Sequence, residues 1–165
     1  METYSGNEFH LTSLAPSQDH WGHAPVDKVA EKRLEVFVIF TDGPGTMTAL
    51  RTAEGLAKQL DAHLRLVLPY EVPYALPLNE PAVTVPFLEG QMRGLAAKTH
   101  MEVDAQVCLC RDKRSALSSL LPPHSLIVMA GKKRWWSTPA ERLARVIQRD
   151  GHHVILAEQR GHCHD

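Results

Sequence analysis

Two uninterrupted apolar runs constrain the fold of this chain more than any other sequence feature. Residues Val36–Phe40 and Leu126–Ala130 contain no polar side chain. A strand of this composition is buried on both faces, an arrangement that occurs in parallel sheets covered by helices on each side. The two runs therefore predict neighbouring central strands of a parallel sheet.

Three further strands are predicted, and a helical pattern or a helix-start signal separates each strand from the next. They are expected at Leu64–Leu68, Val103–Cys110 and Val154–Ala157. Apolar and polar residues alternate in Val103–Cys110, which indicates a strand with one wet face near a sheet edge. Strands that alternate with helices in this way predict a single-domain α/β protein with an open, parallel five-stranded sheet and helices on both faces.

Capping residues indicate where the helices begin. After a turn at Asp42–Gly45, Thr46 or Thr48 is expected to cap the first helix. Asp112 can cap a later one. The segment Thr138–Glu141 combines a threonine cap, a proline at the first helical position and a glutamate three residues after the cap, which predicts a helix start.

A long loop is predicted in the middle of the chain. Residues 69–86 contain five prolines, a density that excludes a regular helix or a central strand. Loops of this length are often functional, and this one is a candidate cover for a ligand cleft. A helix is expected to follow from Phe87 to about His100.

The length of 165 residues fits one domain that buries a sizeable core. The regular pattern covers residues 34–158. Residues 1–33 show no apolar period and are predicted to form a mobile N-terminal arm with a short helix from Val26 to Arg33. Residues 159–165 are predicted to be a polar C-terminal tail.

Composition narrows the function and the compartment. With 18 basic and 19 acidic residues the net charge is −1, which does not favour nucleic-acid binding. Three cysteines are too few for a disulfide framework and favour a reducing compartment. The N-terminus does not resemble a signal peptide, and no apolar run reaches the ~18 residues of a membrane helix. We therefore expect a cytoplasmic protein with no membrane or nucleic-acid partner.

From Leu34 to about Glu158 the chain resembles the universal stress protein (UspA-like) family. Two motifs carry the resemblance, the first strand ending in Phe40-Thr41-Asp42-Gly43 and the segment Ser125–Gly131. The resemblance implies five parallel strands in the order 3-2-1-4-5. The residue pattern agrees, because it makes the two apolar runs central neighbours and the alternating strand an edge. A ligand crevice is then expected between Asp42-Gly43 and Gly131, where the strand order reverses.

The glycine motif of the family's nucleotide-binding members is incomplete here. That motif has a glycine, two residues, a second glycine, nine residues, and then glycine with serine or threonine. Gly131 fits the first position, but Arg134 stands where the second glycine belongs, and Ala144-Arg145 or, with a shorter loop, Ser137-Thr138 stands where the last pair belongs. ATP or AMP is a candidate ligand by the resemblance, but this chain lacks the intact glycine motif with which the family's nucleotide-binding members hold it.

A basic segment occupies the position of that motif. Its cations could hold an anion by point charge beside a helix start, or form a basic surface turn. The complete set of expected ligand-binding residues is Asp42, Gly43, Gly131, Lys132, Lys133, Arg134, Ser137 and Thr138. Asp42 would contact a nucleoside by the resemblance, or cap the turn after it. Arg142, Arg145 and Arg149 share one helical face and are read as a solvated surface.

No motif for catalysis or for a metal is apparent, and we expect neither. Cys108 and Cys110 point to one face of their strand without an adjacent base, and His162-Cys163-His164-Asp165 lies on a terminal tail. The leading hypothesis is a non-catalytic, universal stress protein-like domain in stress response that binds a small ligand or anion, with a nucleotide as one candidate. The alternative is a dimerising interaction module with an empty cleft. The resemblance implies homodimerisation through the last strand, at Val154, Ile155 and Leu156.

Overall fold

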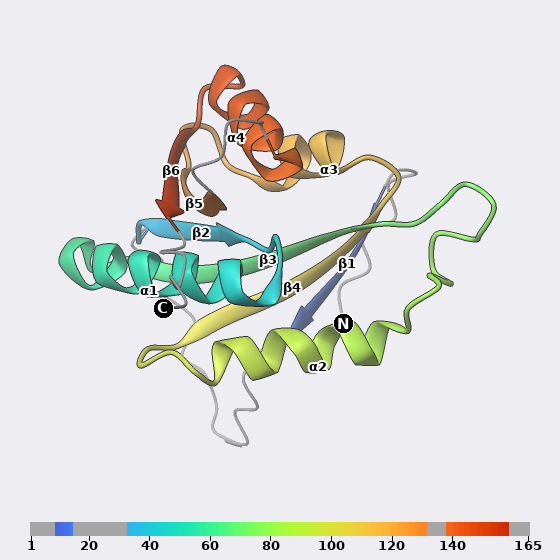
Figure 1. Ribbon diagram of the computed structural model, residues 1–165, viewed down its shortest axis with the longest axis horizontal. Helices are drawn as coiled ribbons and strands as arrows, with labels where there is room; N and C mark the ends of the chain where they lie inside the picture. Colours follow the sequence, from blue (N-terminus) through green and yellow to red (C-terminus); the bar gives the residue numbers. More distant parts are fainter. Residues whose placement is uncertain (1–8, 15–32, 132–137, 159–165) are drawn as a thin grey trace, which may run out of the picture.

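The computed structural model describes residues 9–14, 33–131 and 138–158, which form one sheet and four helices (Figure 1). The strands are β1 (Phe9–Leu14), β2 (Glu35–Ile39), β3 (His63–Glu71), β4 (Val103–Cys110), β5 (Leu126–Gly131) and β6 (His153–Glu158). The helices are α1 (Gly43–Leu60), α2 (Val85–Ala96), α3 (Lys113–Leu120) and α4 (Pro139–Arg149). Among these helices none is both long and apolar enough to cross a bilayer.

The sheet has the strand order β1-β4-β3-β2-β5-β6, and β2 to β6 are all parallel to their neighbours. Counted from the first predicted strand, the five parallel strands lie in the order 3-2-1-4-5, so the predicted α/β class and order are confirmed. The two apolar runs are neighbours, since Val36 lies opposite Leu126 and Val38 opposite Val128.

A sixth strand, which the sequence pattern did not indicate, corrects the expected number. Strand β1 lies within the predicted N-terminal arm and pairs antiparallel with β4, from Phe9 opposite Cys110 to Leu14 opposite Ala105. Strand β4 is therefore not an edge strand. Its predicted wet face is polar only in the first half of the strand, where Asp104 and Gln106 are half-buried. Cys108 and Cys110 are buried, as small apolar side chains are. The rest of the arm, including the predicted helix up to residue 32, lies outside the described residues, as does the tail 159–165.

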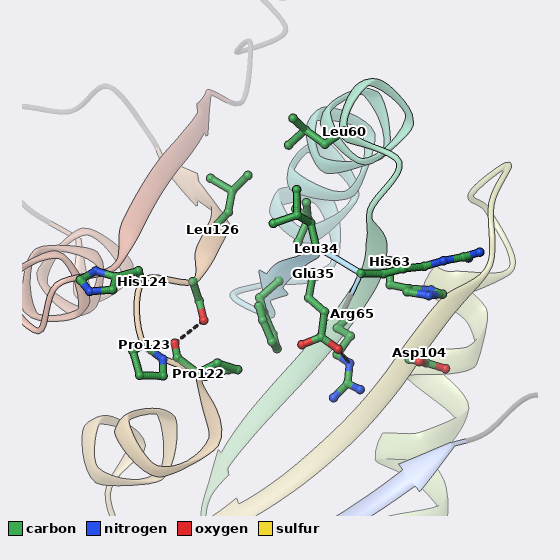
Figure 2. Close-up of a pocket in the computed structure, with 14 residues that line it drawn as sticks. Leu34, Glu35, Leu60, His63, Arg65, Asp104, Pro122, Pro123, His124 and Leu126 are labelled. Carbon is green, nitrogen blue, oxygen red and sulfur yellow. Dashed lines mark hydrogen bonds and ion pairs between the residues drawn. The ribbon is translucent and has the colours of Figure 1, made fainter. Parts of the chain in front are cut away.

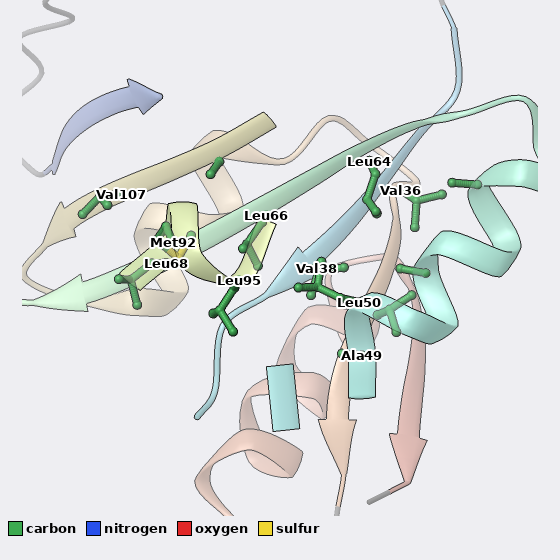
Figure 3. Packing of buried hydrophobic residues seen from close by; sticks show 14 of the residues in the cluster. Val36, Val38, Ala49, Leu50, Leu64, Leu66, Leu68, Met92, Leu95 and Val107 are labelled. Carbon is green, nitrogen blue, oxygen red and sulfur yellow. The ribbon is translucent and has the colours of Figure 1, made fainter. Parts of the chain in front are cut away.

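The two faces of the sheet are covered by different helices (Figure 1). Helices α1 and α2 pack on one face, where Val36, Val38, Leu50, Leu66 and Met92 belong to one buried cluster (Figure 3). On the opposite face, α3 packs over β3 and β4 and α4 over β5 and β6, and the alternate residues of β2, β3 and β5 form a second cluster. Both clusters follow from the strand period of two, which sends consecutive side chains to opposite faces.

Strand β3 is longer than expected and contains a proline although it is a central strand. The predicted run ended at Leu68, whereas β3 continues through Pro69 to Glu71. Strand β2 has ended by then, with its last contact from Phe40 N to Val67 O at 2.8 Å. Because Pro69 faces the same side as Val67, its missing N–H points to the side that β2 has left, so no ladder hydrogen bond is lost.

Caps were predicted for three helices, and the structure confirms two of these predictions. Asp112 caps α3 and Thr138 caps α4 in a capping box with Glu141. Helix α1 instead begins at Gly43 and is capped by Asp42, whose Oδ1 accepts a hydrogen bond from Gly45 N at 2.6 Å. The expected turn is thus the first helical turn, where a proline is tolerated. Thr46 is inside the helix and accepts a hydrogen bond from Thr41 N, and α2 ends at Ala96 rather than near His100.

Candidate functional site

The chain leaves β2 and β5 toward opposite faces of the sheet. After β2 it enters α1 on one face, and after β5 it continues to α4 on the other (Figure 1). In open α/β sheets a ligand crevice forms at such a point, beyond the carboxyl ends of the two strands. The first candidate site is therefore the space at this end of β2, β3 and β5.

A cavity of about 380 Å³ is present at this end, on the α3 and α4 side of the sheet. We call it the carboxyl-end pocket. Its size falls within the range of small-molecule sites. It is lined by Phe40, Thr41, Pro69, Glu71, Asp112, Lys113, Arg114, Met129, Pro139, Ala140, Arg142, Leu143 and Val146.

Three cations lie around the carboxyl-end pocket. Lys113 Nζ is 4.0 Å from Glu71 Oε2, and Arg114 Nη2 is 3.5 Å from Asp150 Oδ1. Arg142, in the first turns of α4, makes no ion pair with any residue that the structure describes. Its guanidinium is therefore available to an anion, and an anion at Lys113 would compete only with a long contact to Glu71.

Of the two acids that line the pocket, Asp112 is already engaged in the fold. Asp112 Oδ2 accepts hydrogen bonds from the Ser115 hydroxyl at 2.7 Å and from Ser115 N at 2.8 Å. These two hydrogen bonds lower the pKa of the Asp112 carboxyl, the hydroxyl contributing most. The carboxylate is thus held at the start of α3 as its cap.

One polar atom at the pocket has no partner in the described structure. The hydroxyl oxygen of Thr41 is buried and makes no hydrogen bond. Thr41 directly follows Phe40, and both residues line the pocket together with Met129. This oxygen lies beside α1, 3.1 Å from the position of a Cβ on Gly45, and is not exposed to a ligand. The pocket therefore combines an apolar wall with cations, which are the elements of a site for a small anion.

Four of the expected ligand-binding residues are described, and none of these four lines the pocket. Asp42 and Gly43 form the cap and first residue of α1, Gly131 ends β5, and Thr138 caps α4. Gly131 also has a packing role, because a Cβ there would lie 3.1 Å from the Cβ of Leu156. A contact of these residues with a ligand stays a prediction.

Part of the expected site lies outside the described residues, namely Lys132, Lys133, Arg134 and Ser137. The sequence analysis missed Thr41 and Lys113 as pocket residues and read Arg142 as part of a solvated face. The capping box at Thr138 was the signal that could have placed Arg142, since it fixes the start of α4 and hence the residues of its first turns.

A larger cavity, of about 650 Å³, opens at the opposite end of the parallel strands (Figure 2). Nothing in the sequence pattern indicated it. It lies between the start of β5, with Leu126, and the starts of β2 and β3, with Leu34 and His63 (Figure 2). Leu34 is 61% exposed and Leu60, at the end of α1, is 44% exposed.

The charges of this amino-end cavity are closer to balance than those of the carboxyl-end pocket. Arg65 Nε lies 3.0 Å from Glu35 Oε1, in ion-pair contact without the alignment of a hydrogen bond. Asp104 lies opposite Arg65 on the neighbouring strand. The lining here holds two arginines, Arg33 and Arg65, against two carboxylates, whereas the carboxyl-end pocket has three cations against two carboxylates. An anion therefore gains less at this end, and the carboxyl-end pocket is the better candidate despite its smaller volume.

The described residues contain no group of three or more histidine, cysteine, aspartate or glutamate side chains that could hold a metal ion. The sequence His162-Cys163-His164-Asp165 lies outside them. Cys108 and Cys110 are free and buried. The hydrogen bond with Cys110 and burial together raise the pKa of Cys108, which opposes formation of its thiolate.

The chain was compared with known proteins. No protein-family model matches it, and no curated protein matches it. Among solved structures it is similar to one described as the crystal structure of a universal stress protein in complex with cAMP. The two share 18% sequence identity with a TM-score of 0.48, over 76% of this chain and 98% of that chain. That structure carries the family name that the sequence resemblance indicated.

Proposed function

We propose that this chain is a non-catalytic, universal stress protein-like domain that binds a small anionic ligand in the carboxyl-end pocket. A nucleoside phosphate such as AMP or ATP is the ligand class proposed. The observation that carries the proposal is the group of three cations, Lys113, Arg114 and Arg142, around a cavity beyond the carboxyl ends of the parallel strands. Service in a stress response and a cytoplasmic location remain predictions from the sequence.

Arg142 is the proposed main anion contact. A guanidinium offers two parallel N–H donors to a phosphate and is less strongly hydrated than an ammonium group. Arg142 makes no ion pair with another described residue, so binding an anion requires no ion pair to break. Lys113 would add a second cation after turning from Glu71, which lies at the limit of ion-pair distance.

The residues of the expected crevice would take the other end of the ligand. Asp42 stands at the cap of α1, directly after the pocket residues Phe40 and Thr41. A carboxylate there could accept hydrogen bonds from a nucleoside, as the family resemblance implies. The basic segment of Lys132, Lys133 and Arg134 follows β5 in the sequence and would add charge on the side of Gly131.

Calorimetric titration with AMP, ATP and inorganic phosphate tests this function. The native protein is expected to bind at least one of them, with an affinity that falls as salt concentration rises. Arg142→Ala is expected to weaken binding about tenfold or more, the magnitude of one charged hydrogen-bonding contact. Arg149→Ala is the matched control, since it removes the same charge from the same helix but does not line the pocket.

Two outcomes would overturn the proposal. One is the absence of any heat of binding with all three probes. The other is an equal loss of affinity in the Arg142 and Arg149 variants, which would show a general charge effect rather than a site. Asp42→Ala, read in the same titration, would separate nucleoside contact from phosphate contact, because only the affinities for AMP and ATP should fall.

A second proposal concerns partner contact, and one observation favours it. Strand β6 pairs only with β5 among the described strands, and Leu156 on it is 43% exposed. An edge strand with an exposed apolar side chain is suited to pairing with another chain. We propose that Val154, Ile155 and Leu156 form the contact of a homodimer. If the pocket binds no ligand, this dimer contact is the function that remains for the chain as an interaction module.

Light scattering after gel filtration tests the dimer. The native chain is expected to elute with twice the mass of its sequence, and Leu156→Lys with the mass of one copy. Leu34→Lys is the matched control, since Leu34 is also exposed but lies at the start of β2. A native monomer at all concentrations, or a dimer that persists in Leu156→Lys, would exclude this interface.

A further inference from the structure

The side chain of Arg111 contacts the proline-rich loop (residues 72–84) through three carbonyl groups. Arg111 Nη1 donates to Val72 O at 2.9 Å and to Pro73 O at 2.6 Å, and Nη2 donates to Leu76 O at 2.9 Å. The guanidinium carbon also lies 5.1 Å from the centre of the Tyr74 ring, in a cation–π contact. One side chain thus contacts four of the five loop residues from Val72 to Leu76.

These contacts join the ends of two neighbouring strands. Arg111 directly follows β4, whereas Val72 directly follows β3. Between the two strands, Val72 N donates to Cys110 O at 2.8 Å, which continues the ladder one step beyond β3. The Arg111 side chain reaches across this last rung and extends the connection into the loop.

The same two strand ends carry one wall of the carboxyl-end pocket. Glu71 precedes Val72, and Asp112, Lys113 and Arg114 follow Arg111. All four of these residues line the pocket, and Lys113 and Glu71 form a 4.0 Å ion pair that joins the two strand ends. The position of this wall therefore depends on how firmly the two strand ends are held together.

We propose that Arg111 is the positioning residue of the carboxyl-end pocket, fixing the proline-rich loop and the start of α3 as one unit. Its planar fork reaches two carbonyls from one nitrogen and a third from the other, an arrangement that the single ammonium nitrogen of lysine does not reproduce. Arg111 makes no contact with the cavity itself. It acts through the residues on either side, so the loop and the pocket wall move together.

Amide hydrogen exchange in the ligand-free protein is the direct test. Two loop amides report on the clamp, Val72 N, which bonds to Cys110 O, and Leu76 N, which bonds to Pro73 O at 3.0 Å. Ser115 N, bonded to Asp112, reports on the pocket wall. In Arg111→Ala all three are expected to exchange about tenfold faster or more, because local opening becomes easier once charged hydrogen bonds are lost.

Two internal comparisons separate this clamp from a general loss of stability. Glu80 N, bonded to Pro77 O in the same loop, lies beyond the Arg111 contacts and should keep its exchange rate. Arg93→Ala removes one charge from exposed α2 and should leave all four amides unchanged. Arg111→Lys should remain near the alanine variant, since it restores the charge but not the fork.

The affinity consequence rests on the proposed function, whereas the clamp does not. With AMP and inorganic phosphate as probes, Arg111→Ala should weaken binding several-fold. The salt dependence of the affinity should stay that of the native protein, because Arg111 does not itself contact the charge of the ligand. If the native protein binds neither probe, the proposed function fails and the amides alone decide the clamp. Three results in Arg111→Ala would each overturn the proposal. The amides of Val72 and Leu76 could exchange at the native rate, or the loop amides could exchange faster while that of Ser115 does not. The third is an affinity for the probes equal to that of the native protein.

Discussion

The face of the sheet under α1 and α2 is packed as one continuous cluster, whereas the face under α3 and α4 is packed as two. On the first face the buried residues run from Ala105 on β4 across to Ala157 on β6. On the second, the cluster beneath α3 and α4 is separate from a small one at Cys108, Cys110 and Ala116. Both faces are built from alternate residues of the same strands, so the helices above them make the difference.

The helices that cover the two faces of the sheet also differ in length, and this difference leaves space for a ligand on one face. Helix α1 has 18 residues and α2 has 12, whereas α3 has 8 and α4 has 11. The shorter helices do not cover the ends of the strands on their face, and both cavities lie there. Polar side chains also lie on that face, among them Arg65 and Gln106, which are half-buried. Both faces thus hold buried core, but only the face under α3 and α4 also leaves room for a ligand.

The largest expected effect contrasts one leucine from each face. Leu50→Ala empties a fully buried site on the α1 face and should lower the free energy of unfolding by about 2–5 kcal/mol. Leu120→Ala, at a half-buried site on α3, should cost about 1 kcal/mol because less apolar surface is buried there. Urea unfolding measures both. Equal losses of unfolding free energy in the two variants would contradict the looser packing expected at Leu120 on the α3 and α4 face.

A pair of glycines in α1 tests how closely this helix approaches the sheet. A Cβ on Gly45 would lie 2.8 Å from the Cβ of Ala130, so Gly45→Ala should cost about 1–3 kcal/mol through overpacking. Gly55 is exposed with nothing within 4 Å of the same position, and Gly55→Ala should stabilise by about 0.5–1 kcal/mol. Thermal unfolding should therefore shift in opposite directions. A shift in the same direction for both would show that the first turn of α1 is not fixed against β5.

The cap of α3 gives the expected pH dependence on the other face. Because its hydrogen bonds lower the pKa of Asp112 in the folded state, the ionised carboxylate stabilises the protein at neutral pH. This contribution should be lost as pH falls below the ordinary value of 3.8 and through the lower pKa of the folded state. Asp112→Ala should cost about 1 kcal/mol at pH 7.

The measurement is the free energy of unfolding at a series of pH values between 7 and strongly acidic conditions. The difference between the native protein and Asp112→Ala should shrink toward the acid end of the series. Asp61→Asn is the matched control, since the Asp61 side chain is exposed and accepts no hydrogen bond from a described residue, and asparagine also tolerates its left-handed backbone at φ 49°. A difference that stayed constant with pH would mean that the carboxylate charge does not stabilise this cap.

The smallest effect is expected at the uncovered part of the α3 and α4 face. The Glu35–Arg65 pair is about one-third exposed, so Glu35→Gln should change the free energy of unfolding by no more than about 1 kcal/mol. The change should disappear at high salt, where exposed charges are screened. A loss comparable to that of Leu50→Ala would show that this region is as tightly packed as the opposite face.

Several features of the molecule could be read from the sequence. The runs Val36–Phe40 and Leu126–Ala130 predicted adjacent central strands because only a doubly covered strand is apolar at every position. The caps at Asp112 and Thr138 were predictable because a cap depends on residues within one helical turn. The class and the order of the five parallel strands followed from such local signals together with the family resemblance.

The remaining features depended on distant contacts. Strand β1 has no strong pattern of its own and forms because β4 offers an edge, and Pro69 is accepted in β3 because β2 has already ended beside it. Arg111 and Val72 are far apart in the chain and meet only where β3 and β4 end together. Local residue patterns determine which segments become strands and helices, whereas the pocket is a relation between their ends, which exists only after the sheet has been assembled.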